Sequence, residues 1–178
     1  GIMIWSYFSY GNTTNPAISN ATIANNKITL NIDGWRQLWG NSPSKGITLE
    51  TESDSPINNV NILNNEISFN NFSGNSRESD KRAFGISFWR IYFPDVENQN
   101  LRIVGNKITN PLAGGIDLSM FVDQGEISQN RIVNPGQSKE IFRAFASGIL
   151  IDRDVEDIEI KGNSIVDNQT TNTLKVGI

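Results

Sequence analysis

The stretch Leu101-Arg-Ile-Val-Gly-Asn-Lys-Ile-Thr109 decides the fold, because four other stretches of the chain repeat its pattern without gaps. The shared pattern is apolar-x-Ile-x-x-Asn-x-Ile-x, and its other copies are residues 21–29, 60–68, 125–133 and 158–166. The shared asparagines are Asn26, Asn65, Asn106, Asn130 and Asn163. Their spacings of 39, 41, 24 and 33 residues differ, so the unit is constant while the connections between units vary.

A second motif, Gly-Ile-x-apolar, follows the copies of the first at residues 46–49, 85–88, 115–118 and 148–151. Each repeat therefore predicts three short strands with alternating apolar side chains, and the Asn marks a tight turn between the first two. Strands this short cannot bury a face alone. Stacked copies can, because each coil pairs in parallel with the next at a spacing of about 4.8 Å.

The repeats predict one all-β domain over residues 1–178, a parallel β-helix of about five coils. The coils lie near residues 21–49, 60–88, 101–118, 125–151 and 158–178. The inward isoleucines should form three columns: Ile23, Ile62, Ile103, Ile127 and Ile160; Ile28, Ile67, Ile108, Ile132 and Ile165; and Ile47, Ile86, Ile116 and Ile149. Asparagine tolerates left-handed backbone, and its amide can bond to the asparagine one coil away, so the shared Asn residues predict an internal ladder.

The Asn-x-Ile turn followed by Gly-Ile resembles the recurrent repeat of the pectin-lyase-like superfamily, over nearly the whole chain. The resemblance implies a right-handed coil. It also implies a group that includes polysaccharide lyases, glycoside hydrolases, sugar epimerases, phage tailspikes and surface proteins without known catalysis. The histidine motifs of pectate lyases, polygalacturonases and alginate epimerases are absent, because the chain has no histidine. A mechanism based on carboxylates, or on Arg and Lys, stays open.

Composition excludes several other classes of function. The 178 residues carry a formal net charge of −4, which argues against nucleic acid as the main partner, because phosphate binding requires a basic face. No apolar run approaches the roughly 20 residues of a membrane span. The chain has neither cysteine nor histidine, so disulfides, thiol nucleophiles, the Ser-His-Asp triad and the usual zinc sites are excluded.

Two glutamates become neighbours on the outward side of the first strand. Glu126 and Glu159 should lie one coil apart at about 5 Å, close to the carboxylate separation of a retaining glycosidase. Arg102, a candidate substrate-binding residue, precedes them in the same column, and Lys161 lies in the next column. The alternative interpretation is a solvated face on which Arg102 and Lys161 neutralise the two carboxylates.

Two aspartates are brought together in the same way on the outward side of the third strand. Asp117 and Asp152 should lie one coil and two residues apart, roughly 8 Å by strand geometry. That separation falls within the range of an inverting glycosidase, which leaves room for a water molecule between its carboxyl groups.

Tryptophans near these acids predict a surface for sugar. Trp5 and Trp89 share an outward column with Glu50 between them, and Trp35 and Trp39 lie in a long loop. A sugar can pack its C–H face on a flat ring while its hydroxyls bond to carboxylates. The alternative is that loops cover these side chains, which then serve as ordinary core.

We expect a polysaccharide-recognising domain of a secreted or virion protein. If the domain is catalytic, we expect it to degrade the polysaccharide as a hydrolase or lyase that uses carboxylates. The alternative is a non-catalytic structural or adhesive solenoid. Expected partners are polysaccharide, further segments of a longer parent solenoid and, compatible with either function, two more copies in a homotrimer. No cofactor is expected, although Asp152, Asp154 and Asp157 cluster as a weak Ca²⁺ candidate that lacks the EF-hand glycine and distal glutamate.

Overall fold

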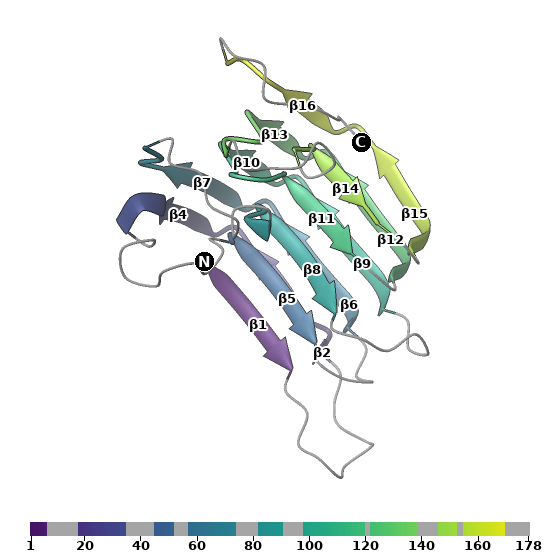
Figure 1. Ribbon diagram of the computed structural model, residues 1–178. Coiled ribbons are helices and arrows are strands. Elements are labelled where there is room, and N and C mark those ends of the chain that lie inside the picture. The colour runs from purple at the N-terminus through teal and green to yellow at the C-terminus, as the bar shows by residue number, and fades with distance from the viewer. Residues whose placement is uncertain are drawn as a thin grey trace.

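Each coil of the chain contributes one strand to each of three parallel sheets, which wind into a right-handed β-helix (Figure 1). This computed structural model describes residues 1–6, 18–34, 45–51, 57–73, 82–90, 98–119, 122–138, 146–152 and 155–169. The colour in Figure 1 runs steadily along the stack from purple to yellow, because each coil pairs with the coil before it and the coil after it. The predicted fold class is therefore confirmed.

The three sheets are named here by their strands, in the order in which neighbours pair. Sheet A contains β1 (Ile2–Ser6), β5 (Ile47–Thr51), β8 (Ile86–Arg90), β11 (Ile116–Ser119) and β14 (Ile149–Ile151). Sheet B contains β2 (Ile18–Ser19) and β3 (Thr22–Ala24), both paired with β6 (Ile57–Leu63), then β9 (Asn98–Val104), β12 (Val122–Ser128) and β15 (Val155–Lys161). Sheet C contains β4 (Lys27–Asn31), β7 (Glu66–Asn70), β10 (Lys107–Thr109), β13 (Arg131–Val133) and β16 (Ser164–Val166).

Helix contributes little to the described chain. One helical turn occupies residues 32–34, at the end of β4. Within the described ranges, no helix has the length and apolar character needed to span a membrane. The architecture is thus built from strands and the turns that join them.

The predicted isoleucine columns form the core. Ile62 pairs in register with Ile103, and Ile103 pairs with Ile127, so the same side chain recurs at the same place in successive coils. The columns of sheet C and sheet A align in the same way. Side chains in the middle coils are fully buried, whereas Ile160 and Ile165 in the last described coil are only half-buried. The hydrophobic interior therefore runs continuously along the solenoid axis.

The predicted asparagine ladder is also present, at the turn between sheets B and C. Asn65 donates its backbone N–H and its side-chain amide to Asn106 Oδ1, at 2.9 and 3.0 Å. Asn106 donates in the same way to Asn130, and the ladder runs from Asn26 to Asn163. Each interior amide also donates to a backbone carbonyl of the preceding coil, as Asn106 does to Ile62. The ladder thus satisfies backbone groups that no sheet reaches at this turn.

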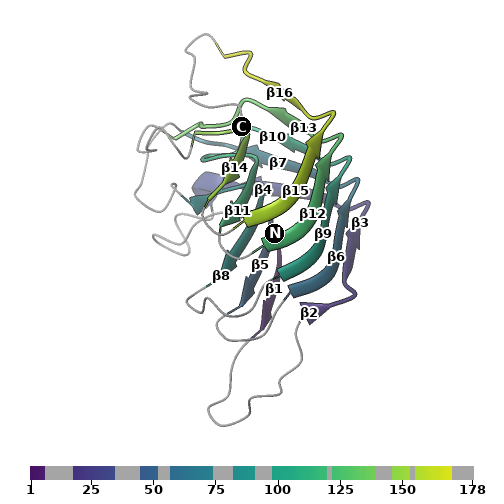
Figure 2. The same cartoon turned by 90° about the vertical axis from the view of Figure 1, so that its right-hand side faces the viewer.

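The strands of sheet B are longer than the sequence pattern predicted, and they bend. Strands β6, β9, β12 and β15 each span seven residues, and each contains one residue with left-handed backbone. These residues are Asn59, Asn100, Gln124 and Asp157, with φ between 47° and 61°. Asn100 donates its amide to Asn59, and Asn59 donates to Asn20, so a second, exposed amide ladder lines this bend. Figure 2 shows the curved strands side by side.

A column of glycines brings the coils close together at the start of sheet A. A Cβ atom on Gly115 would lie 2.6 Å from the carbonyl oxygen of Gly148 and 2.6 Å from Ile132 Cδ1. Gly46 and Gly85 are equally crowded by the next coil and by an isoleucine of sheet C. The Gly-Ile motif therefore has a steric cause: only glycine fits between the sheet A backbone and the core.

The unfolding free energy of the Gly115→Ala variant is expected to be about 2–3 kcal/mol lower than that of the wild type, because the added methyl group must push apart backbone and core. Chemical denaturation monitored by circular dichroism measures the loss. Gly34→Ala is the matched control, since among the described residues its Cβ would meet nothing closer than 3.6 Å. Equal stability of Gly115→Ala and the wild type would contradict the steric account.

Candidate functional site

The outer face of sheet A carries polar side chains that are nevertheless shielded from solvent. Thr48, Ser87 and Asp117 alternate with core residues and so point away from the core, yet they are only 2%, 2% and 7% exposed. The alternating pattern of the third strand predicts the same outward direction for Asp117. The outward direction is confirmed, and both faces of sheet A are buried at these positions.

Asp117 is the central group of this face. Its Oδ2 accepts a hydrogen bond of 3.3 Å from Ser87 Oγ, and its Oδ1 accepts a short one from Ser119 Oγ. Burial raises the pKa of Asp117 to about 6, because removal from water disfavours the charged carboxylate. The two serine hydroxyls and the charge of Lys45 oppose this shift, and the charge of Asp152 adds to it.

Charged groups lie beside Asp117 on both flanks. Lys45 Nζ lies 3.9 Å from Glu50 Oε1, and both side chains are largely buried. Burial also lowers the pKa of Lys45, despite the attraction of Glu50 and Asp117. On the other flank, Asp117 is in register with Leu150, so exposed Asp152 stands one coil and two residues away, as predicted. We call Asp117, Ser87, Ser119, Lys45, Glu50 and Asp152 the acid cluster.

Thr48 adds an unsatisfied hydroxyl to this face. Its register partner on β8 is Ser87, whose hydroxyl bonds to Asp117. The Thr48 Oγ1 atom is buried and has no hydrogen-bond partner within the described ranges. A buried hydroxyl without a partner costs stability.

The stability of the fold should depend on pH through Asp117. Because its pKa is higher in the folded chain than in the unfolded chain, protonation stabilises the fold, and that stabilisation is lost as pH rises from about 4 through 6. The Asp117→Asn variant cannot ionise. As the pH rises from 4 to 7.5, its unfolding free energy should therefore increase by about 3 kcal/mol relative to that of the wild type. Urea denaturation of both proteins across this range measures the difference. If the unfolding free energies of the two proteins changed with pH in the same way, this result would contradict the raised pKa.

The tryptophans predicted to hold sugar are placed only in part. The backbone of Trp5 pairs in register with Glu50, and Glu50 pairs with Trp89, so the predicted column exists. The side chains of Trp5 and Trp89 lie outside what the structure describes, as do Trp35 and Trp39 altogether. Their predicted role in substrate binding therefore stays a prediction.

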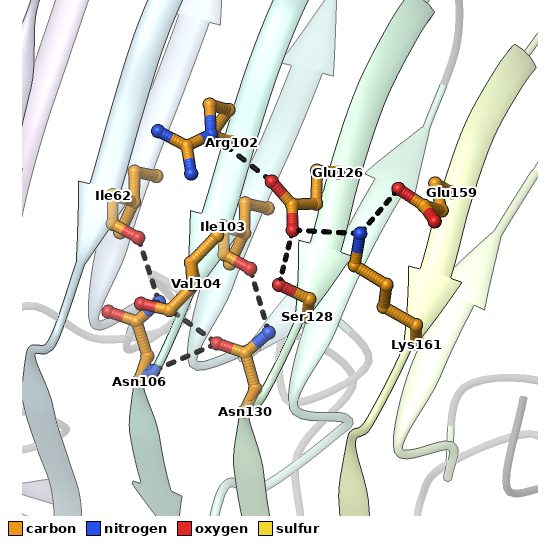
Figure 3. Close-up of polar contacts among 10 residues, drawn as sticks. All are labelled: Ile62, Arg102, Ile103, Val104, Asn106, Glu126, Ser128, Asn130, Glu159 and Lys161. Carbon is orange, nitrogen blue, oxygen red and sulfur yellow. Dashed lines mark hydrogen bonds and ion pairs between the residues drawn. The ribbon is translucent and has the colours of Figure 1, made fainter.

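The second predicted pair, Glu126 and Glu159, lies on the outer face of sheet B and is in register as expected. Lys161 Nζ lies 2.7 Å from Glu159 Oε2 and 3.5 Å from Glu126 Oε1, so it bridges the two carboxylates (Figure 3). Arg102 Nε donates to Glu126 Oε2 at 3.2 Å, and Ser128 donates to Glu126 Oε1 at 2.7 Å. We call Arg102, Glu126, Lys161 and Glu159 the charge ladder.

The two pairs of carboxylates differ in electrostatic character. Hydrogen bonds from Ser128 and Arg102, with the positive charge of Lys161, hold the pKa of Glu126 below its ordinary value. Glu126 is therefore an ionised, neutralised group, whereas the pKa of Asp117 is raised to about 6, so Asp117 still holds its proton in mildly acidic solution. Proton donation requires the second kind of group, so the acid cluster is the better candidate for acid/base chemistry.

The calcium interpretation gains no geometric support. Within the described ranges, no group of three or more acidic side chains is arranged to hold a metal ion. Asp157 is exposed at the bend of β15, and Asp154 lies outside the described residues.

Sequence reasoning missed four members of the site. Ser87, Ser119, Thr48 and Lys45 were given no role there. The available signal was the run of small hydroxyl side chains next to Asp117 in the stacked columns, since such side chains can bond to a buried carboxyl group.

Comparison with protein-family models, with curated proteins and with solved structures found no match to the chain. The description of the fold therefore rests on the repeat and on the three stacked sheets.

Proposed function

We propose that this β-helix recognises a polysaccharide and hydrolyses it by acid/base catalysis in the acid cluster. The observation that carries the proposal is the environment of Asp117, a buried carboxyl group whose pKa is about 6 and which two serine hydroxyls hold in place. Raised carboxyl pKa values of this kind are typical of general acids that work near neutral pH.

Asp152 supplies the second carboxylate of the proposed pair. Asp117 protonates the glycosidic oxygen as the bond to the leaving sugar breaks, and Asp152 takes a proton from the water that attacks the anomeric carbon. Their offset of one coil and two residues, roughly 8 Å by strand geometry, favours inversion of configuration. Exposure rises from Asp117 towards Ser119 and Asp152, so substrate would approach from that side.

The test is release of new reducing ends from a panel of neutral and acidic polysaccharides. The proposal expects release from at least one member, with inverted anomeric configuration of the first product and faster release below pH 6 than at pH 8. Ultraviolet absorbance of the products separates hydrolysis from elimination, because only a lyase leaves an unsaturated sugar. Elimination products, or an absence of both release and binding across the panel, would contradict the proposal.

A second candidate is a stiff structural or adhesive solenoid without catalysis. The charge ladder favours this function, because Arg102 and Lys161 neutralise Glu126 and Glu159 in the way expected of a stabilised surface. Binding of a polysaccharide without any release of reducing ends would favour this candidate.

The resemblance to the pectin-lyase-like superfamily supports the polysaccharide proposal, since enzymes and tailspikes of that group act on polysaccharides. Under this proposal the protein works outside the cell or on a virion surface, where polysaccharides are encountered. A homotrimer is compatible with either candidate function.

A further inference from the structure

The guanidinium group of Arg102 is only partly used by the charge ladder. Its Nε atom donates to Glu126, whereas its two terminal nitrogens have no partner within the described ranges. The side chain is 53% exposed. Figure 3 shows the terminal nitrogens pointing away from Glu126, and the strand on that side of β9 is β6. A free pair of N–H donors therefore faces solvent over β9 and β6.

The ladder holds this group in place before any ligand binds. Glu126 receives hydrogen bonds from both Arg102 and Ser128 and lies 3.5 Å from Lys161, so the carboxylate that orients Arg102 is itself fixed. A side chain ordered in advance loses less conformational entropy on binding. The geometry of the free N–H pair suits a planar carboxylate, which can accept two parallel hydrogen bonds.

Asn61 provides a polar neighbour for such a ligand. It is the register partner of Arg102 on β6, it is half-buried, and its side-chain amide has no hydrogen-bond partner within the described ranges. The described strands on this side, β2, β3 and β6, carry no charged residue, and Asn58 lies three residues before Asn61. In the opposite direction, Asp123 and Glu156 would repel an anion. A ligand would therefore extend from Arg102 towards β6 and β2.

We propose that Arg102 and Asn61 form a binding subsite for the carboxylate of an acidic sugar unit on the outer face of sheet B. The adjoining sugars would lie along the solenoid axis over the amides of β6, because the coil spacing of about 4.8 Å is close to the length of one hexose unit. The subsite rests on the proposed recognition of polysaccharide and names an acidic polymer as its ligand. It lies on a different sheet from the acid cluster.

A short oligoglucuronate and a neutral glucose oligomer of equal length are the probes. Titration is followed by the NMR signal of the Arg102 Nε–H group and by calorimetry. Oligoglucuronate should shift that signal, and the neutral oligomer should bind at least tenfold more weakly. Arg102→Gln should weaken oligoglucuronate binding about tenfold or more, and Arg102→Lys should restore only part of it, since lysine keeps the charge but loses the paired donors.

Arg131→Gln is the matched control, because Arg131 is an exposed arginine on sheet C whose guanidinium group makes no hydrogen bond or ion pair within the described ranges. An equal loss in this variant, or an unshifted Arg102 signal in the wild type, would overturn the subsite. The NMR readout on the wild type applies even if a variant fails to fold. Unchanged polysaccharide binding in Arg102→Gln would reject the subsite alone, whereas oligoglucuronate binding at Arg102 without release of reducing ends would reject hydrolysis alone.

Discussion

Replacing Asp117 by Asn is expected to lower the rate of polysaccharide hydrolysis by about 10²- to 10⁴-fold, the usual contribution of a general acid. Asparagine keeps the shape of the side chain; its oxygen can accept from one of the two serines, and its amide nitrogen can donate to the hydroxyl oxygen of the other, so the fold should survive. It has no acidic proton to give to the leaving oxygen. Initial rates of reducing-end release from the best substrate of the wild type measure the effect, and circular dichroism confirms the fold.

The Glu126→Gln variant decides between the two pairs of carboxylates. If Asp117→Asn retains full activity while Glu126→Gln loses it, catalysis belongs to sheet B and the assignment to the acid cluster is wrong. Asp152→Asn should behave like Asp117→Asn, because the attacking water needs its own base. The rate of the Asp117 variant should also lose the decline above pH 6 that titration of Asp117 causes in the wild type.

The largest expected effect on stability is that of Asn106→Ala, which should cost about 3–5 kcal/mol. The side chain is 1% exposed and bonds to four neighbours at once: Asn65, Asn130 and the carbonyls of Ile62 and Val104. Its removal leaves several buried polar groups unsatisfied, at about 1–3 kcal/mol each. Guanidinium denaturation measures the change in unfolding free energy.

Asn163→Ala provides the matched control for the ladder. Asn163 accepts from Asn130 and donates to the carbonyl of Ile127, but it is only half-buried, so water can replace part of what is lost. Its loss should be about 1 kcal/mol. If the two variants lost equal stability, burial would not explain the strength of the ladder.

The repeat allowed the interior of this protein to be predicted in detail. Positions such as Ile103 and Asn106 recur at fixed offsets within each repeat, and each pairs with the same residue type in the next coil. One sequence pattern therefore determines the strand register, the core and the asparagine ladder. The register of Asp117 with Leu150, and hence its offset from Asp152, followed from the same reasoning. Strictly periodic contacts are the part of a structure that a sequence specifies most directly.

What lies outside the coil could not be predicted in this way. The burial of Thr48 and Asp117 on the outer face of sheet A was not predictable from the alternation, because the alternation predicts only the direction in which each side chain points. The contacts of Arg102 and Lys161 depend on side-chain conformations, which strand spacing alone leaves open. The bend at Asn59 and Asn100 was missed because glutamine and aspartate replace asparagine in the later coils.

The unequal spacing of the ladder asparagines has a consequence for how such a molecule can diversify. Asn65 and Asn106 are 41 residues apart and Asn106 and Asn130 only 24, yet their hydrogen bonds have the same lengths. The hydrogen bonds between ladder asparagines therefore do not depend on the length of the chain that connects them. Closing a loop of twice the length costs only about 0.6 kcal/mol in entropy, far less than one buried rung contributes. Insertions can accumulate at the sides of the coil, and new recognition surfaces can be tried there, while the scaffold stays unchanged.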